Sequence, residues 1–110
     1  MKNLTLLILF NLLFVSTFSF GQERENKKIK ISGKIVEKDT NQPLEFATIA
    51  FINIKNPKAI YGGLTDGKGE FNVDINAGMY DVKVEFIGFK PLEIKNQKYT
   101  TDTKLDNILL

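Results

Sequence analysis

The sequence predicts an all-β protein, a sandwich of seven short antiparallel strands of the immunoglobulin-like type that follows a signal peptide. Two stretches, 71–75 and 80–86, alternate strictly between apolar and polar residues, which is typical of strands with one buried face. Turn signals rich in Gly, Asn, Asp and Pro recur about every 8 to 12 residues. After the N-terminal segment, no stretch shows the periodicity of a helix.

Residues 1–21 have the layout of a secretory signal peptide. Lys2 precedes a mostly apolar run over 4–18, and Ser19 and Gly21 are small residues at the −3 and −1 positions of a cleavage site. The alternative is a membrane anchor, but this run is shorter than the roughly 20 residues that span a bilayer. We therefore expect export, cleavage after Gly21 and no membrane span in the mature chain.

The first three strands follow a polar segment at 22–28 that we expect to be flexible. The first spans 29–37. The second, 44–53, is apolar at both parities, so it is a central strand or has one face covered by a neighbour; its β-branched residues favour a strand over a short helix. The third, 59–65, contains Gly62 and Gly63, which indicate a bulge or an edge position.

The last four strands begin with the alternating pair. Because residues 76–78 form a short link ending in glycine, we expect the strands at 71–75 and 80–86 to form a tight hairpin. A short sixth strand spans 92–95, and a seventh spans 103–110 after a polar segment. The free last strand predicts a weak edge-strand dimer with a second copy.

Composition argues against catalysis, a metal site and nucleic-acid binding. The chain has no His and no Cys, so it lacks a thiol nucleophile, a disulfide framework and the commonest general base. Its 15 basic and 13 acidic residues are interspersed and form no basic stripe. Six carboxylates alternate with apolar residues and are expected on solvated faces rather than in a cleft. They are Glu45, Glu70, Asp74, Asp81, Glu85 and Glu93.

Three local patterns were weighed as sites. Residues 66–70 offer two carboxylates with a lysine between them, which indicates a turn rather than a calcium loop. Tyr61 and Phe89 are the aromatic residues expected to be exposed, as a stacking surface for carbohydrate or peptide. Lys34, Glu85 and Asn107 resemble the isopeptide-forming set of collagen-adhesin B-type domains, although outward parity of the first two argues against it.

Five motifs in order resemble a known family. They are 32–36 (SGKIV), 42–49 (QPLEFATI), 64–71 (LTDGKGEF), 77–82 (AGMYDV) and 84–89 (VEFIGF). Together they resemble the carboxypeptidase regulatory-like domain over residues 29–110, and in particular the copy that follows the signal peptide of TonB-dependent outer-membrane receptors of Bacteroidetes-type bacteria. The resemblance implies a transthyretin-like sandwich at the periplasmic side of the outer membrane, without catalytic residues or cofactors.

Eleven residues of these motifs are expected to build the fold, through close approach of the sheets, tight turns or core packing. Gly33 and Ala47 would allow the two sheets to approach, and Gly78 would free the backbone beside Tyr80. The full set is Gly33, Pro43, Ala47, Thr65, Asp66, Gly69, Phe71, Gly78, Tyr80, Phe86 and Gly88.

Two functions remain open from the sequence. The first is a non-catalytic accessory domain that contacts envelope proteins, or the plug and barrel of a receptor, through sheet edges or loops. Such receptors continue beyond the position of Leu110, so we expect a fragment, a truncated product or a free-standing relative. The second is a secreted module that binds carbohydrate or peptide.

Overall fold

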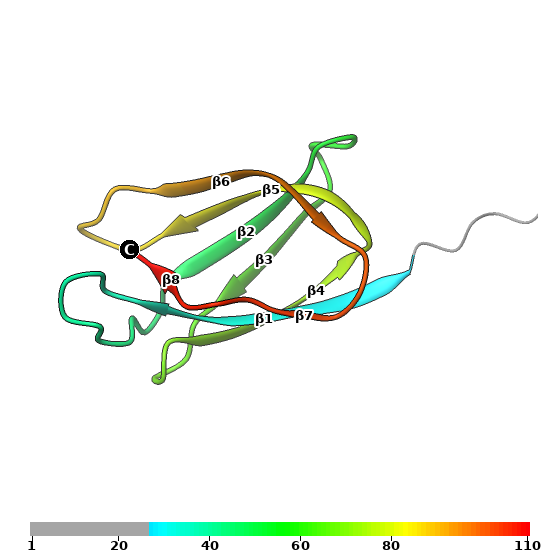
Figure 1. Cartoon of the computed structure of the whole chain (residues 1–110). Helices are drawn as coiled ribbons and strands as arrows, with labels where there is room; N and C mark the ends of the chain where they lie inside the picture. Colours follow the sequence, from blue (N-terminus) through cyan, green and yellow to red (C-terminus); the bar gives the residue numbers. More distant parts are fainter. Residues whose placement is uncertain (1–26) are drawn as a thin grey trace, which may run out of the picture.

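The computed structural model describes residues 27–110 as two β-sheets packed face to face (Figure 1). The first sheet contains β1 (Lys28–Val36), β4 (Glu70–Asn76), β7 (Thr103–Lys104) and β8 (Ile108–Leu109). The second contains β3 (Ile60–Leu64), β2 (Thr48–Asn53), β5 (Gly78–Glu85) and β6 (Leu92–Tyr99), in that order. The all-β sandwich is therefore confirmed. The expected signal peptide lies outside the described residues.

In the first sheet, β1 lies between strands of opposite direction. It pairs antiparallel with β4 but parallel with β7 and β8, through Ile31 beside Thr103 and Ile35 beside Ile108. The expected seventh strand is thus two short strands, and the sandwich is not wholly antiparallel. The reason is that β6 ends at the end of the sandwich where β1 begins, and there the chain crosses to the first sheet, so β7 runs in the same direction as β1 (Figure 1).

The expected hairpin between β4 and β5 is wrong, because the two strands belong to different sheets. β4 pairs with β1, whereas β5 pairs with β2 and β6. Ala77 alone connects them, and its N–H donates to the Lys27 carbonyl at 2.7 Å. Both strands do alternate as predicted, and their buried residues join one core. These residues are Phe71, Val73, Ile75, Tyr80, Val82 and Val84.

The second sheet begins four residues later than the sequence predicts. β2 starts at Thr48, because Phe46 has a left-handed backbone (φ 62°) that no strand continues through. β2 is central, as one of the two interpretations of its apolar pattern required. β3 is an edge strand and pairs with β2 without a bulge. The register shift lies instead in the pairing of β5 with β6, where two residues of β6 (95 and 96) lie opposite the single residue between Tyr80 and Val82. β6 extends to Tyr99, beyond the predicted end at residue 95.

One end of the core is aromatic. Phe51 packs edge-on against Tyr80 and Tyr99, with ring centroids 6.3 and 5.8 Å apart. The Tyr80 hydroxyl donates to the Asn76 carbonyl at 2.6 Å, and the Asn76 amide donates to the Tyr61 hydroxyl at 2.8 Å. Burial raises the pKa of both Tyr80 and Tyr99. The hydroxyl groups of Tyr61 and Tyr80 are thus satisfied within the fold.

Candidate functional site

The turn before β4 is built on Asp66. Its Oδ1 accepts hydrogen bonds from the backbone N–H groups of Lys68 (2.9 Å) and Glu70 (3.0 Å), while its own N–H donates to the Glu70 carbonyl. Gly69 has φ of 73°, and a Cβ there would lie 2.6 Å from the Ile35 carbonyl oxygen. This carboxylate serves the turn. Within residues 27–110 no group of three or more His, Cys, Asp or Glu side chains is placed to hold a metal.

Thr65, just before this turn, fixes the irregular segment that precedes β2. Its buried hydroxyl donates to the Leu44 carbonyl and accepts from the Ala47 N–H at 2.8 Å. The Phe46 N–H donates to the Thr65 carbonyl at 3.1 Å. These bonds hold Phe46 in a backbone conformation that is costly for a bulky residue. The Phe46 side chain is nevertheless 66% exposed, so the fold presents it to solvent.

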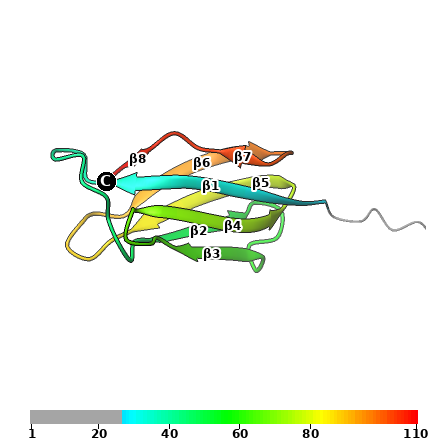
Figure 2. The same cartoon turned by 90° about the horizontal axis from the view of Figure 1, so that it is seen from below.

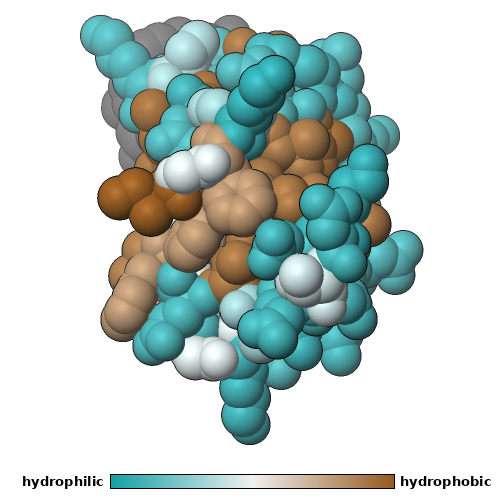
Figure 3. All heavy atoms as spheres, turned by 90° about the vertical axis from the view of Figure 1, so that its left-hand side faces the viewer, coloured by the Kyte–Doolittle hydropathy of each residue, from teal (hydrophilic) through white to brown (hydrophobic). Residues whose placement is uncertain are grey.

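Phe46 lies beside the loop that joins β5 to β6. In this loop Ile87 is 90% exposed, and the rings of Phe86 and Phe89 pack with centroids 5.6 Å apart. We call Phe46, Phe86, Ile87, Phe89 and Pro91 the apolar end. With Thr48 and Glu85 these residues line a recess of about 380 Å³, and Figure 3, which views this end, shows a hydrophobic patch on the surface.

The sequence did not single out Phe46 or Ile87. Phe46 was assigned to a strand, where its side chain would have had a sheet neighbour. Ile87 lies in a turn, and Gly88 behind it has φ of 85° with open space around it. An apolar residue in such a turn was the available signal for an exposed contact residue.

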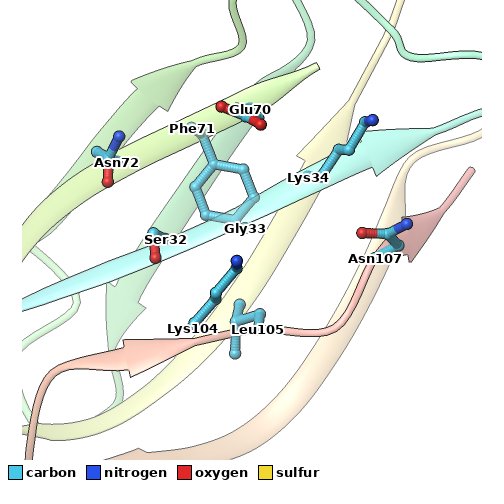
Figure 4. Close-up of a pocket in the computed structure, with 9 residues that line it drawn as sticks. All are labelled: Ser32, Gly33, Lys34, Glu70, Phe71, Asn72, Lys104, Leu105 and Asn107. Atoms are coloured by element: carbon cyan, nitrogen blue, oxygen red, sulfur yellow. The ribbon is translucent and has the colours of Figure 1, made fainter. Parts of the chain in front are cut away.

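A second concave surface is polar and lies over the outer face of the first sheet. Figure 4 shows it between β4, β1 and the segment that joins β7 to β8, with a volume of about 330 Å³. Lys34 and Asn107 line it, whereas Glu85 belongs to the other sheet and lines the apolar end. The structure therefore does not bring together the three residues of the isopeptide pattern.

The two aromatic residues expected to form one stacking surface are also apart. Tyr61 lies in β3, where its ring packs edge-on against Tyr80 at 6.1 Å. Phe89 lies at the apolar end, beyond the other end of β5. Both are half-buried. The exposed aromatic residue at the apolar end is Phe46 instead.

The role of Gly33 differs from the one that the sequence predicts, whereas Gly69 and Gly88 have the positive φ expected of turn glycines. A Cβ at Gly33 would lie 2.8 Å from Cζ of Phe71, which belongs to the neighbouring strand of the same sheet. Gly33 thus makes room for a core ring rather than for the opposite sheet. The close approach between sheets is at Gly63, where a Cβ would lie 2.5 Å from Cγ2 of Val73. Sequence reasoning gave Gly63 only the role of a bulge or edge residue.

Three other residues expected to build the fold are Gly78, Pro43 and Ala47. Gly78 is not in the left-handed region, and a Cβ there would meet only ordinary contacts at 3.5 Å and beyond, so no backbone freedom is required of it. Pro43 pairs with Val36 in an isolated bridge at the end of β1. Ala47 is fully buried in the core.

Comparison with known structures supports the fold. A chain of a type II cohesin–X–dockerin complex from Acetivibrio cellulolyticus, a C-terminal interface mutant, is 26% identical with a TM-score of 0.54, over 72% of this chain and 52% of that chain. Chlorocatechol 1,2-dioxygenase from Pseudomonas putida (15% identity, TM-score 0.56) and a putative carbohydrate binding protein from Bacteroides uniformis (22%, 0.55) match over 72% of this chain and 47% and 40% of theirs. These last two likenesses show the fold alone.

The chain spans about half the length of the first of these structures. Among curated proteins, no sequence matches it significantly. A family model, that of the CarboxypepD_reg-like domain, matches residues 31–110, which include every described strand except the first residues of β1. The chain therefore belongs to the family of carboxypeptidase regulatory-like domains.

Proposed function

We propose that the protein is a non-catalytic, exported packing module that contacts a larger envelope protein through its apolar end. We further propose that this larger protein is a TonB-dependent outer-membrane receptor, of which the domain forms the N-terminal periplasmic part. The observation that carries the proposal is the exposure of Phe46 (66%) and Ile87 (90%) around one recess. Exposed apolar patches of this kind mark interaction surfaces.

The backbone at Phe46 supports a contact role for this residue. A left-handed conformation for a bulky residue costs roughly 1–2 kcal/mol, and here the hydrogen bonds of Thr65 maintain it. Since the side chain faces solvent, the conformation gains no core packing in the isolated domain. A partner surface that buries the Phe46 ring would offset the cost of this backbone conformation.

Backbone hydrogen bonds hold Leu110 at one end of the sandwich. Its N–H donates to the Val36 carbonyl at 3.0 Å, and its carbonyl accepts from the Lys38 N–H at 2.9 Å. Figure 1 shows the C-terminus at the same end of the sandwich as the loop between β5 and β6. A segment continuing from Leu110 would thus begin beside the apolar end.

The charged residues of the second sheet support a non-catalytic role. Glu85 pairs with Lys83 at 2.9 Å on the outer face. Lys95 lies 3.4–3.5 Å from both Glu93 and Asp81. Exposed carboxylates paired with lysine are solvated, which is typical of an outer sheet face rather than of a catalytic acid or base. Within residues 27–110 no helix is long and apolar enough to cross a membrane.

The first test is the DNA sequence downstream of the Leu110 codon. A plug and barrel encoded in frame, or after a single stop or frameshift, would support the receptor assignment. An unrelated gene after a stop would refute it.

The contact surface is then tested by titrating the domain with the purified remainder of the receptor in a calorimeter. Ile87→Glu should weaken binding at least tenfold, because it places a charge in the apolar recess. Ile54→Glu is the matched control, since Ile54 is also an exposed apolar loop residue but lies at the opposite end of β2. Equal effects of the two substitutions would exclude the apolar end as the contact surface.

A second candidate function is carbohydrate binding at the same recess. The paired rings of Phe86 and Phe89 offer a stacking surface, and one structural neighbour is described as a putative carbohydrate binding protein. Saturable chemical-shift changes of these two residues on titration with oligosaccharides would support this function, and unchanged spectra would reject it.

A further inference from the structure

The edge strand β3 differs from the other sheet edges in having neither charge nor interruption. It reads Ile-Tyr-Gly-Gly-Leu, whereas β4 carries two acidic residues and β6 carries three charged residues. The remaining edge is broken into β7 and β8, two residues each. Proteins ordinarily protect sheet edges with charges, prolines or bulges, so an unprotected edge is a template for another strand.

The backbone of β3 has groups available at this edge. The ladder with β2 continues through the bonds from Asn53 N–H to the Ala59 carbonyl and from Thr65 N–H to the Ala47 carbonyl. Because hydrogen-bonding alternates along an antiparallel strand, the odd-numbered residues of β3 bond to β2. The N–H and C=O groups of residues 60, 62 and 64 therefore point away from the sheet. Figure 2 shows β3 along the margin of the molecule, with no strand beyond it.

The side chains beside these groups are apolar. Ile60 and Leu64 are 57% and 55% exposed on the outer face of the sheet. Their row continues onto β2, where Ile52 pairs with Ile60 and Ala50 pairs with Gly62. A strand added at this edge would extend an apolar outer face.

We propose that two copies of this chain associate by antiparallel pairing of β3 with β3, about a two-fold axis at Gly62. The pairing joins the two four-stranded sheets into one of eight strands. Each copy supplies three N–H and three C=O groups, which together form six hydrogen bonds. In this register Ile60 lies opposite Leu64 of the second copy.

The occupant is a second copy because the sequence of β3 complements itself. Tyr61, the one large inward residue, lies opposite Gly63, which has no side chain to obstruct it. Lys58 precedes the strand and Asp66 follows it, so antiparallel pairing brings the basic end of one copy toward the acidic end of the other, and the two-fold axis repeats this. A strand of another protein would match β3 as well only if it carried the same arrangement of apolar residues, glycines and flanking charges.

This location differs from the edge dimer that the sequence predicted at residues 103–110. That edge is available only as the two short strands separated by residues 105–107. We therefore place the pairing at β3, and the experiment below separates the two edges.

Sedimentation equilibrium of the purified protein over a concentration series tests the proposal. The wild type should rise in mass toward a dimer, while I60K/L64K should associate at least tenfold more weakly, because it faces lysine with lysine across the axis. A mixture of I60K/L64K with I60E/L64E should restore a heterodimer. Leu109→Lys is the matched control, since Leu109 is exposed and lies outside β3, in the other candidate edge; it should leave association unchanged.

Cysteine cross-linking provides a second measurement, since the chain has no native cysteine. A Cβ at Gly62 has no neighbour closer than 3.8 Å, so Gly62→Cys should fold. Hydrogen-bonded antiparallel residues have Cα atoms about 5.5 Å apart, within disulfide range. Gly62→Cys should therefore form a covalent dimer on oxidation, faster than Leu109→Cys. A wild type that stays monomeric at millimolar concentration, or a dimer that persists in I60K/L64K, would overturn the proposal. Neither outcome bears on the role of the apolar end.

Discussion

Replacing Thr65 with valine should destabilise the domain more than any other near-isosteric change at a threonine. The hydroxyl of Thr65 donates to the Leu44 carbonyl and accepts from the Ala47 N–H, and all three residues are buried. Valine keeps the shape of the side chain but leaves both backbone groups without a partner.

The expected magnitude follows from those two groups. A buried polar group left unpaired costs about 1–3 kcal/mol, so two cost about 2–6 kcal/mol. Release of Phe46 from its left-handed conformation offsets about 1–2 kcal/mol of this. The net loss in the free energy of unfolding should be about 1–4 kcal/mol, and the melting temperature should fall by on the order of 15 °C.

Urea unfolding followed by far-UV circular dichroism measures this loss, since the chain has no tryptophan. Thr65→Ser keeps both hydrogen bonds and should lose only about 1 kcal/mol with its methyl group. Thr48→Val removes an exposed, long hydrogen bond (3.4 Å) and should change stability by no more than about 0.5 kcal/mol. If Thr65→Val were no worse than Thr65→Ser, the hydroxyl would not be what holds the segment before β2.

Three further predictions concern the backbone and the core and use the same unfolding assay. Gly69→Ala should lower the free energy of unfolding by about 2–4 kcal/mol, because the new Cβ would lie 2.6 Å from a carbonyl oxygen. Gly88 also has positive φ but has open space around it, so Gly88→Ala should cost about 1 kcal/mol. Similar losses for the two substitutions would contradict the role of the close contact. Gly63→Ala should cost about 1–3 kcal/mol, because the new Cβ would overpack against Val73. The double substitution with Val73→Ala should cost less than the sum of the two single substitutions. Strict additivity would contradict the contact between these two residues. Burial raises the pKa of Tyr80 above its ordinary value of 10.0. The contribution of Tyr80 to stability is therefore complete below pH 10 and is lost as pH rises through the folded-state pKa. Tyr80→Phe should reduce this loss of stability at alkaline pH, and an unchanged pH profile would contradict the reasoning.

The sequence predicted the buried faces well and the partners of strands less well. Alternation correctly placed Phe71 and Tyr80 in the core. It was silent on whether these residues lie side by side in one sheet or face each other across two, because a strand shows the same period in both cases. The short link at Ala77 does not decide this either, because it is compatible with both geometries; the pairing of β4 with β1 and of β5 with β2 and β6 does.

The candidate site could not be found from the sequence for a related reason. Phe46 lies in a run that is apolar at both parities, and its positive φ follows from hydrogen bonds to Thr65, a residue 19 positions away. Propensity and periodicity are local quantities, so they do not register a backbone conformation imposed by a distant partner. The family resemblance, by contrast, rests on ordered motifs and is confirmed.

The pairing of β1 has a consequence for the order in which the protein folds. The second sheet is drawn from the continuous stretch between β2 and β6, but β1 must wait for β4, and then for β7 and β8 near the end of the chain. Contacts between such distant segments form slowly, since a long loop has to close first. During synthesis, which starts at the N-terminus, one side of β1 therefore stays unpaired until the last residues of the domain have been made. Folding is completed only after synthesis has delivered the whole domain, so the pairing of β1 with β7 and β8 is the last step in forming the first sheet.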